Sequence, residues 1–382
     1  MSATRRIDTL VVGGGPAGLA TAIAARAQGL EVEVLDRFHP PIDKPCGEGI
    51  LPAGLAALES LGVGRVQLGG REIRGVRYLD AASGVVAEGG FAPRPGLGVR
   101  RTTLHQALAH RAAEAGARLS WGLFAEGLSS AEDGTWVVDT PDGPIEARWV
   151  VGADGLASHA RRWAGLEGRP ARGRRRRYGV RRHYQVAPWT DHVEVHWTHG
   201  CEAYVTPVGE DLVGVAMLWG GSREGFDRHL AKFPALERRL HGAPAVSRDR
   251  GCGPFLQRAS GVVRGTLALV GDAAGYVDAL TGEGLGHAFR EARALAEALA
   301  AGDLALYQAA HRRIVAGPDR LTRATLLLTR HPGLRRRVLR ALAHDPRLFA
   351  RLLQVQNGDA SFAGAAVPAL AKLGVRASLQ VR

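Results

Sequence analysis

The sequence predicts a mixed α/β (α+β) protein made of an α/β domain, an antiparallel β-sheet domain and a C-terminal helical segment. Three patterns within the 382 residues support this fold class. At the N-terminus, a buried strand, a glycine-rich turn, a helix and a second strand follow one another. Between residues 178 and 219, alternating Val, Tyr, Trp and His residues are typical of an antiparallel sheet. After Leu304, apolar residues recur at helical spacing.

The N-terminal segment predicts a dinucleotide-binding βαβ unit of the Rossmann type. In its G-x-G-x-x-G turn, Gly13 permits the tight turn, Gly15 lets the backbone approach a pyrophosphate, and Gly18 lets the helix pack closely. Asp36 follows about twenty residues later, where a carboxylate accepts hydrogen bonds from ribose hydroxyls. The strand, helix and second strand are expected at Ile7–Val12, Leu19–Gln28 and Glu31–Leu35.

The middle of the chain predicts antiparallel strands in two places. Turn signals at 132–134 and 141–143 separate β-rich segments between Gly116 and Gly152, and they indicate a small antiparallel meander. The strands within 178–219 are expected to form the sheet that carries the substrate pocket.

A strand–turn–helix near residue 272 has the chemistry of a ligand site. The strand Thr266–Val270 places Asp272 at the carboxyl edge of a sheet, where α/β proteins bind ligands. The turn Gly282-Glu283-Gly284 then opens a helix over Leu285–Ala301. The positive end of that helix would stabilise an anionic group placed before it.

Two of these segments resemble the later sequence fingerprints of a known flavoprotein group. Val150–Ser158 (V-V-G-A-D-G-L-A-S), with Arg161 after it, resembles the "DG" motif of the group that includes p-hydroxybenzoate hydroxylase and the geranylgeranyl reductases. Val270–Gly275 and Gly282–Leu285 resemble its "GD" motif. The three motifs occur in the group's order. The resemblance implies tightly bound FAD, and the lack of a second G-x-G-x-x-G implies NAD(P)H as a transient reductant.

The resemblance also implies which residues contact FAD. An arginine at the start of the helix over 101–115 is expected to contact it, and Arg101 is preferred to Arg100. Ala125, on a strand expected over Arg118–Gly127, is placed at the adenine. The predicted FAD-binding residues are Gly13, Gly15, Ala17, Gly18, Asp36, Arg37, Cys46, Gly47, Arg101, Ala125, Asp154, Asp272, Gly284 and Leu285.

The substrate pocket has candidate residues but no assigned acid or base. The segment Lys44–Gly49 resembles a Cys-Gly-rich loop that the reductase branch carries near the flavin. On the predicted sheet, each aromatic, methionine or histidine side chain either lines the pocket or packs within the sheet. The candidates are Cys46, Glu48, His196, Tyr204, Met217 and Trp219.

The C-terminal region is expected to consist of short helices divided by Pro318, Pro332 and Pro346. Its apolar residues occupy one face and its arginines the others, as in Leu334–Leu342. We expect a helical lid on the substrate domain, with contact to an anionic membrane as the alternative. The predicted division is an FAD-binding domain at 1–70, 97–168 and 255–303, a substrate domain at 71–96 and 169–254, and a helical region at 304–382.

Composition limits the partners and the compartment. The formal net charge of +13 comes mainly from arginine, in runs such as Arg172–Arg177, and its simplest explanation is a GC-rich genome. No nucleic-acid-binding motif accompanies the charge, so no nucleic-acid partner is predicted. The three separated cysteines indicate neither a disulfide framework nor a metal site. Without a secretory-type start or a long apolar run, the protein is expected in the cytoplasm, with peripheral contact at the inner membrane face left open.

Two activities are compatible with the motifs. The first is an FAD-dependent monooxygenase (hydroxylase) that uses NAD(P)H and O2 on an aromatic or hydrophobic secondary metabolite, such as a phenolic polyketide or alkylphenol. The alternative is a geranylgeranyl-reductase-like C=C reductase of isoprenoid or quinone lipids. Gly275, where the hydroxylases commonly carry histidine, favours the reductase. Glu202–Pro207 favours the hydroxylase, because it keeps only the proline of the reductases' Tyr-x-Trp-x-Phe-Pro segment. A non-catalytic flavin-binding scaffold is a third hypothesis.

Overall fold

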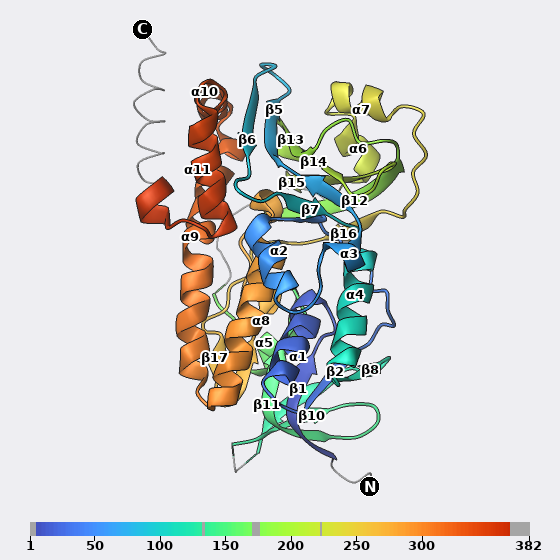
Figure 1. Cartoon of the computed structure of the whole chain (residues 1–382), viewed down its shortest axis with the longest axis vertical. Helices are drawn as coiled ribbons and strands as arrows, with labels where there is room; N and C mark the ends of the chain where they lie inside the picture. The colour runs from blue at the N-terminus through green and yellow to red at the C-terminus, as the bar shows by residue number, and fades with distance from the viewer. Residues whose placement is uncertain (1–4, 132–133, 170–175, 222–223, 367–382) are drawn as a thin grey trace.

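The computed structural model describes residues 5–131, 134–169, 176–221 and 224–366. It contains two large sheets, one above the other along the long axis of the molecule, and a group of C-terminal helices along one side (Figure 1). The mixed α/β class predicted from the sequence is confirmed. The arginine run from 172 to 175, the turn at 132–133 and the chain beyond 366 lie outside the described residues.

The first sheet is built around the N-terminal βαβ unit. Strand β1 (Arg5–Val12) pairs in parallel with β2 (Val32–Asp36) and with β11 (Ile145–Gly152), and helix α1 (Pro16–Ala27) connects β1 to β2. The apolar, β-branched residues of these strands are buried on both faces, as a parallel sheet requires. The sheet order is β17-β18-β11-β1-β2-β8, with β8 at Arg118–Trp121, β17 at Val263–Arg264 and β18 at Leu267–Leu269.

The predicted antiparallel meander is present beside β11. Strands β9 (Gly127–Ser130) and β10 (Trp136–Asp139) pair antiparallel with each other, and β10 pairs antiparallel with β11. The single strand expected over 118–127 is wrong, because the chain leaves the sheet at Gly122, whose φ of +81° is left-handed. Ala125 therefore lies in the loop between β8 and β9.

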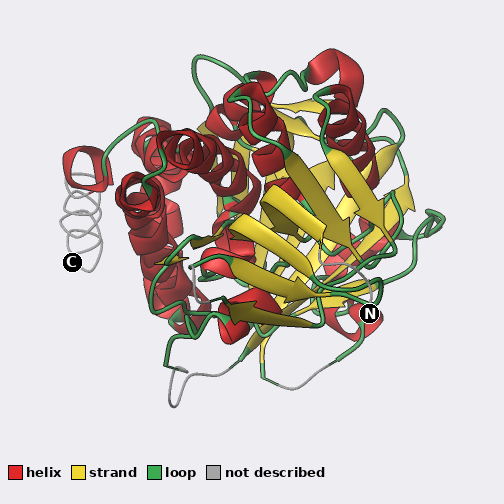
Figure 2. Cartoon of the chain, turned by 90° about the horizontal axis from the view of Figure 1, so that it is seen from below, coloured by secondary structure: helices red, strands yellow, loops and turns green. Residues whose placement is uncertain are grey.

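Helices cover the first sheet and a small sheet joins it to the second. Helix α1 packs against α4 (Arg101–Glu114) and α8 (Gly284–Ala301), and α8 also packs against α2 (Pro52–Glu59). Figure 2 shows the helices gathered around the strands. The smaller elements are α3 (Arg65–Leu68), α5 (His159–Trp163), η1 (Gly271–Ala274), η2 (Ala279–Thr281) and the three-stranded sheet of β3 (Gly49–Ile50), β7 (Gly96–Gly98) and β4 (Arg71–Ile73).

The second sheet has the order β16-β12-β15-β14-β13-β5-β6. Its neighbours pair antiparallel except β5 and β13, which run parallel, so the expectation of a purely antiparallel sheet is corrected at this pair. One face packs against α6 (Phe226–Leu230) and α7 (Pro234–Leu240). The strands are β5 (Gly75–Asp80), β6 (Val86–Gly90), β12 (Arg177–Gln185), β13 (His192–Thr198), β14 (Cys201–Pro207), β15 (Leu212–Gly220) and β16 (Arg250–Cys252). The domain boundaries proposed above stay a prediction.

The C-terminal helices are α9 (Leu304–Arg330), α10 (Pro332–His344) and α11 (Pro346–Asn357), followed by a π-helical turn at Phe362–Ala366. Pro332 and Pro346 begin helices, as expected. Pro318 does not divide its helix: it is buried inside α9, which packs along α8, and this packing offsets the roughly 3 kcal/mol that an interior proline costs.

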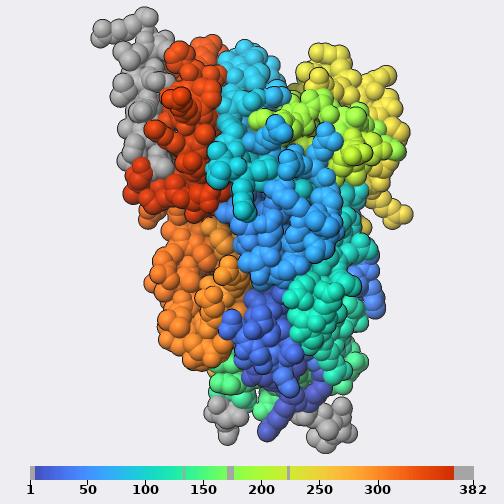
Figure 3. All heavy atoms as spheres, viewed as in Figure 1, coloured from blue at the N-terminus to red at the C-terminus, as the bar shows by residue number. Residues whose placement is uncertain are grey.

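Helices α10 and α11 pack on β5 and β6 at one edge of the second sheet. They share a core with that edge, and Phe349 of α11 contacts Tyr78 of β5 at 4.7 Å between ring centroids. Figure 3 shows the red surface of these two helices directly beside the light-blue surface of the segment that contains β5 and β6. The sequence pattern predicted that the arginines of α10 lie on its outer face. Arg335 is an exception, because it is buried in an ion pair with Asp80 at 2.7 Å. Within the described residues, no helix combines the length and apolarity needed to cross a membrane.

Candidate functional site

A cavity of about 450 Å³ lies between the first sheet's helices and the second sheet. Its lower wall comes from the glycine turn before α1, the loop before α5, and the segment from η1 to the start of α8. Its upper wall comes from the inner face of the second sheet. Of the predicted FAD-binding residues, those lining this cavity are Gly15, Ala17, Cys46, Gly47, Arg101, Asp154, Asp272, Gly284 and Leu285.

The turn before α1 leaves its backbone accessible from the cavity. A Cβ atom added at Gly15 would meet only the Arg101 Nη2 atom, at 3.8 Å. At Gly18, in contrast, it would lie 1.9 Å from the Gly13 carbonyl oxygen, so this glycine is required for the close packing of helix on turn. The free N–H groups of the first turn of α1 therefore stand beside open space, as an anion site needs.

Arg101 supplies a buried cation beside this turn. Its side chain is 8% exposed, and its Nε atom has no hydrogen-bond partner among the described residues. Burial lowers the pKa of this guanidinium, although the nearby Asp272 and Glu48 carboxyl groups raise it. A buried guanidinium without a paired carboxylate is costly unless an anion completes the site. The position beside Gly15 therefore fits the pyrophosphate of FAD. The alternative, Arg100, does not line the cavity and has its Nε atom 3.6 Å from Glu48.

The residues predicted for the adenosine end lie outside this cavity. The Asp36 carboxylate accepts hydrogen bonds from the backbone N–H groups of Gly14 and Phe38, both at 2.9 Å. Arg37 lies over the ring of Phe124, with 5.6 Å from its Cζ atom to the ring centroid. Gly13, Gly18 and Ala125 do not line the cavity either. The structure thus places Asp36 at the end of β2 beside the glycine turn.

The two later motifs are joined to each other by Arg161. Asp154 caps α5, because its carboxylate accepts from Ser158 Oγ at 2.5 Å and from the N–H group of Ala160 at 3.1 Å. Arg161, on α5, donates to the Ala273 carbonyl at 3.0 Å and so fixes the loop that carries Asp272. Burial raises the pKa of Asp272, and Arg101 opposes that shift.

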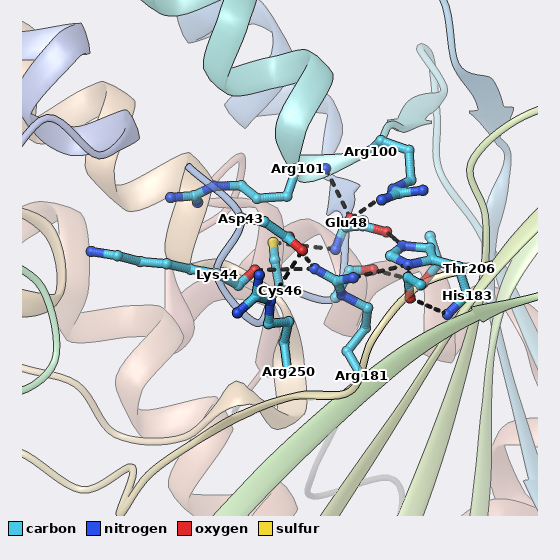
Figure 4. Close-up of polar contacts among 12 residues, drawn as sticks. Asp43, Lys44, Cys46, Glu48, Arg100, Arg101, Arg181, His183, Thr206 and Arg250 are labelled. Carbon is cyan, nitrogen blue, oxygen red and sulfur yellow. Dashed lines mark hydrogen bonds and ion pairs between the residues drawn. The ribbon is translucent and has the colours of Figure 1, made fainter. Parts of the chain in front are cut away.

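The loop from Asp43 to Glu48 forms one end of the cavity (Figure 4). Glu48 has a left-handed φ of +60°, which is strained for a residue with a side chain. Its carboxylate accepts from the Arg101 backbone N–H at 2.8 Å and contacts His183 Nε2 at 2.5 Å. Glu48 lines the cavity as predicted, but both of its carboxylate oxygens are engaged within the protein. It therefore holds the loop and the start of α4 together.

Arg181 and His183 of β12, which sequence reasoning missed, hold this loop from the other side. Arg181 donates to the Asp43 carboxylate at 2.5 Å and to the Lys44 carbonyl at 3.3 Å, and its Nη1 atom lies 2.9 Å from His183 Nδ1. The signal available in the sequence was a pair of charged or polar residues at alternate positions of an otherwise β-rich segment. Burial lowers the pKa of His183, although Glu48 raises it.

Cys46 lies in the same loop and is half-buried. Burial raises the pKa of its thiol, so the side chain stays protonated at neutral pH and is not a reactive thiolate. The neighbouring Gly47 carbonyl accepts a hydrogen bond from Thr206 Oγ1 at 2.8 Å, which ties the loop to β14.

Strand alternation decides which sheet candidates reach the cavity. Tyr204 lines it, together with Val193, Val195, Thr206, Ala216 and Leu218. His196, Met217 and Trp219 do not, because they fall at the other parity of β13 and β15 and point to the opposite face. His196 bonds Glu194 at 3.0 Å, and Trp219 stacks at 4.1 Å on His229. The prediction of His196, Met217 and Trp219 as pocket residues is corrected accordingly.

Comparison with known proteins agrees with this geometry. The profile of the family described as "FAD binding domain" matches residues 6–246. The chain is 31% identical over 328 residues to the menaquinone reductase of Mycobacterium tuberculosis (strain H37Rv), covering 80% of this chain and 79% of the relative. It is also 31% identical to the chloroplastic geranylgeranyl diphosphate reductase of Oryza sativa subsp. japonica, covering 78% of this chain and 67% of the relative.

Solved structures share the fold at low sequence identity. The flavin-dependent brominase Bmp2 superposes with a TM-score of 0.83 at 17% identity, covering 99% of this chain and 100% of that one. The p-nitrophenol 4-monooxygenase PnpA from Pseudomonas putida DLL-E4 gives 0.76 at 20% identity, covering 93% and 99%. The glycine turn, the buried Arg101 beside it, the family profile and the two reductases lead to one conclusion. The chain belongs to the FAD-binding-domain family, within the superfamily of p-hydroxybenzoate hydroxylase and the geranylgeranyl reductases, and is an FAD-dependent oxidoreductase.

Proposed function

We propose that the protein reduces carbon–carbon double bonds in an isoprenoid or quinone lipid, with NAD(P)H or another donor reducing the FAD. The similarity to reductases, at 31% identity over most of the chain, carries this proposal. The proposed substrate class differs from the aromatic metabolites favoured by the sequence alone. The brominase and the monooxygenase are less than 25% identical to this chain, so their similarity supports the fold only.

The upper wall of the cavity supports a hydrocarbon substrate. Val193, Val195 and Leu218 present apolar side chains from the second sheet. Two hydroxyl groups on this wall already have partners: Tyr204 donates to the Leu280 carbonyl, and Thr206 donates to the Gly47 carbonyl. Because these two hydroxyl groups are already hydrogen-bonded within the protein, an apolar polyprenyl chain can pack against them without breaking a hydrogen bond.

Different residues of the cavity would bind the cofactor and orient the substrate in this reaction. FAD supplies the hydride chemistry when bound. Arg101 and the first turn of α1 would hold its pyrophosphate, while Asp272 and the start of α8 would border its ring system. The start of α8 directs a positive dipole into the cavity, which stabilises negative charge there. The apolar wall orients the lipid chain and excludes water from it.

A stopped-flow experiment tests the proposal. Anaerobically reduced, FAD-loaded protein is mixed with geranylgeranyl diphosphate or menaquinone, and flavin reoxidation is followed by absorbance. We expect reoxidation by at least one of these lipids without oxygen. The variant Ala216→Phe, which fills the cavity, should lose this reaction while keeping its FAD. The control variant Ala56→Phe, on the exposed side of α2, should keep both the reaction and the FAD.

Oxygen transfer is the competing outcome of the same experiment. Reduced protein that ignores both lipids but reacts rapidly with oxygen in the presence of alkylphenols would replace the proposed reductase with the hydroxylase suggested by Glu202–Pro207.

A further inference from the structure

A second cavity, of about 330 Å³, adjoins the 450 Å³ cavity described above. We call the larger one the flavin cavity and the second one, which is lined mainly by polar residues, the polar cavity. Both cavities are bordered by Gly271, Asp272, Tyr276 and Gly284, so a single segment of chain lies between them. The rest of the second cavity's wall comes from residues 257–259 and 274–278, from the start of α8 and from α9. It includes Glu283 and Thr322. None of the functions assigned above uses these two residues.

Glu283 is a buried carboxyl group at the boundary of the two cavities. It is 6% exposed, and its Oε1 atom has no hydrogen-bond partner among the described residues. It lines the polar cavity, whereas Thr281, two residues before it, lines the flavin cavity. The Glu283 Oε2 atom lies 2.7 Å from Thr281 Oγ1, so this contact links a residue that lines the polar cavity to a residue that lines the flavin cavity.

The number of protons available to the hydrogen-bonded groups next to Glu283 indicates its protonation state. Thr281 Oγ1 lies 2.7 Å from Thr322 Oγ1, which lies 3.0 Å from the Pro318 carbonyl oxygen. This series of groups has three contacts but only two hydroxyl protons, and the Pro318 carbonyl at its end can only accept a hydrogen bond. With Glu283 ionised, one contact lacks a proton. With Glu283 protonated, all three are hydrogen bonds.

The surrounding charges favour the same form. The pKa of Glu283 is raised to about 8, mainly by burial and also by Asp319, while the Thr281 hydroxyl and Arg290 oppose the shift. His287 is neutral at pH 7, because burial lowers its pKa to about 3. Titratable and charged groups that line the polar cavity with Glu283 are Asp319, Arg323 and His311 on α9, His287 and Glu291 on α8, and Arg258, Asp272, Tyr276 and Asp278 in the segments before α8. Arg290 on α8 and Tyr78 on β5 also interact with Glu283 electrostatically.

We propose that Glu283 holds the proton for the reduction and passes it to the flavin cavity through the Thr281 hydroxyl. This rests on the function proposed above. Reduction of a C=C bond adds a hydride to one carbon and a proton to the other. The hydride and its electron pair would be supplied by reduced FAD. The Thr281 hydroxyl, turning from Thr322, gives its proton to the second carbon and takes one from Glu283. The Glu283 carboxylate then regains a proton from bulk solvent through the polar cavity.

Glu283→Gln tests whether the proton is held, without any substrate. Glutamine keeps the size and an N–H donor but cannot ionise. Because the folded protein keeps a proton that the unfolded chain releases above pH about 4.5, stability should fall as pH rises from about 4.5 to 8. We therefore expect the wild-type Tm to fall relative to that of Glu283→Gln across this range. A Tm difference independent of pH would overturn the inference.

Single-turnover kinetics then test the transfer. With menaquinone or geranylgeranyl diphosphate as oxidant, Glu283→Gln and Thr281→Val should slow flavin reoxidation by about a hundredfold or more. Thr281→Ser, which restores the hydroxyl, should recover most of the rate, and flavin reduction by dithionite should not change. Glu297→Gln, at an exposed position of α8, is the matched control.

The outcomes separate the two proposals. Wild-type rates in Glu283→Gln would overturn the relay while leaving the reductase intact. A wild type that reduces neither lipid would overturn the proposed function, and the comparison of Tm values would still decide whether Glu283 holds a proton.

Discussion

At the scale of single residues, the site depends on a buried cation and an accessible glycine. The Arg101 Nε atom has no hydrogen-bond partner in the part of the chain that the structure describes, and the side chain lies beside Gly15, where an added Cβ atom would meet nothing else within 4 Å. Both features make sense only with an anion between them, so both positions should affect FAD more than folding.

Gly15→Val should abolish FAD binding and leave the apoprotein folded. The added side chain fills the space reserved for the pyrophosphate but meets only the flexible end of Arg101 in the protein. The ratio of flavin to protein absorbance measures the loss, and circular dichroism checks the fold. A folded variant with full flavin content would show that the cofactor does not lie at this turn.

Arg101→Met should weaken FAD binding by about tenfold to a hundredfold, because a hydrogen bond to a charged group contributes roughly 1.5–3 kcal/mol. Removal of an uncompensated buried charge should leave the Tm of the apoprotein equal or higher. Arg100→Met, one residue away and outside the cavity, should retain more FAD than Arg101→Met. The reverse order, measured by flavin titration, would move the contact to Arg100.

At the scale of elements, helix α10 is fixed to the second sheet by a buried ion pair. Arg335 donates through Nε to Asp80 at 2.7 Å and through Nη1 to the Thr198 carbonyl at 3.0 Å. The side chains of Arg335 and Asp80 are 2% and 0% exposed. Removal of one partner leaves the other charge buried and unpaired.

Arg335→Met should therefore lower the free energy of unfolding by about 3–5 kcal/mol. Arg336→Met, on the exposed face of the same helix, should change it by less than about 0.5 kcal/mol. Urea unfolding of both variants makes the comparison. Equal stabilities would mean that the ion pair does not hold α10.

The elements near the N-terminus were predictable because their signals are local. Glycines in β1–α1 and in the start of α8 occur within a few residues of the strands and helices they join. Which face of β13 or β15 meets the cavity was not predictable, because alternation gives two faces and only the packing of α6 and α7 selects one. Pro318 and Arg335 were misjudged for the same reason: contacts far along the chain outweigh local preference.

At the scale of the whole molecule, the FAD-binding and second sheets enclose the site, and the C-terminal helices complete it. Gln356 of α11 lines the flavin cavity and donates to the Thr281 carbonyl, so residues far apart in sequence meet at the proposed proton path. The polar cavity depends on α9 in the same way. No local sequence pattern could have indicated that α9 and α11 contribute to these two cavities.

Contact with an anionic membrane stays a prediction at this scale. Arg336, Arg337 and Arg340 are exposed on α10, and the chain carries a net charge of +13. If these residues meet lipid, the protein should sediment with phosphatidylglycerol vesicles at low salt and be released at high salt. Substitution of the three by glutamine should then reduce binding. No sedimentation at low salt would remove the membrane from the description.

The reductase proposal is tested most directly by the mass of the product. FAD-loaded protein is reduced without oxygen, incubated with geranylgeranyl diphosphate or menaquinone, and the lipid is examined by mass spectrometry. We predict a product two hydrogen masses heavier that carries one double bond fewer in its isoprenoid chain. No such product under anaerobic conditions, together with a gain of one oxygen mass by a phenolic lipid only in air, would contradict the reductase and establish oxygen transfer.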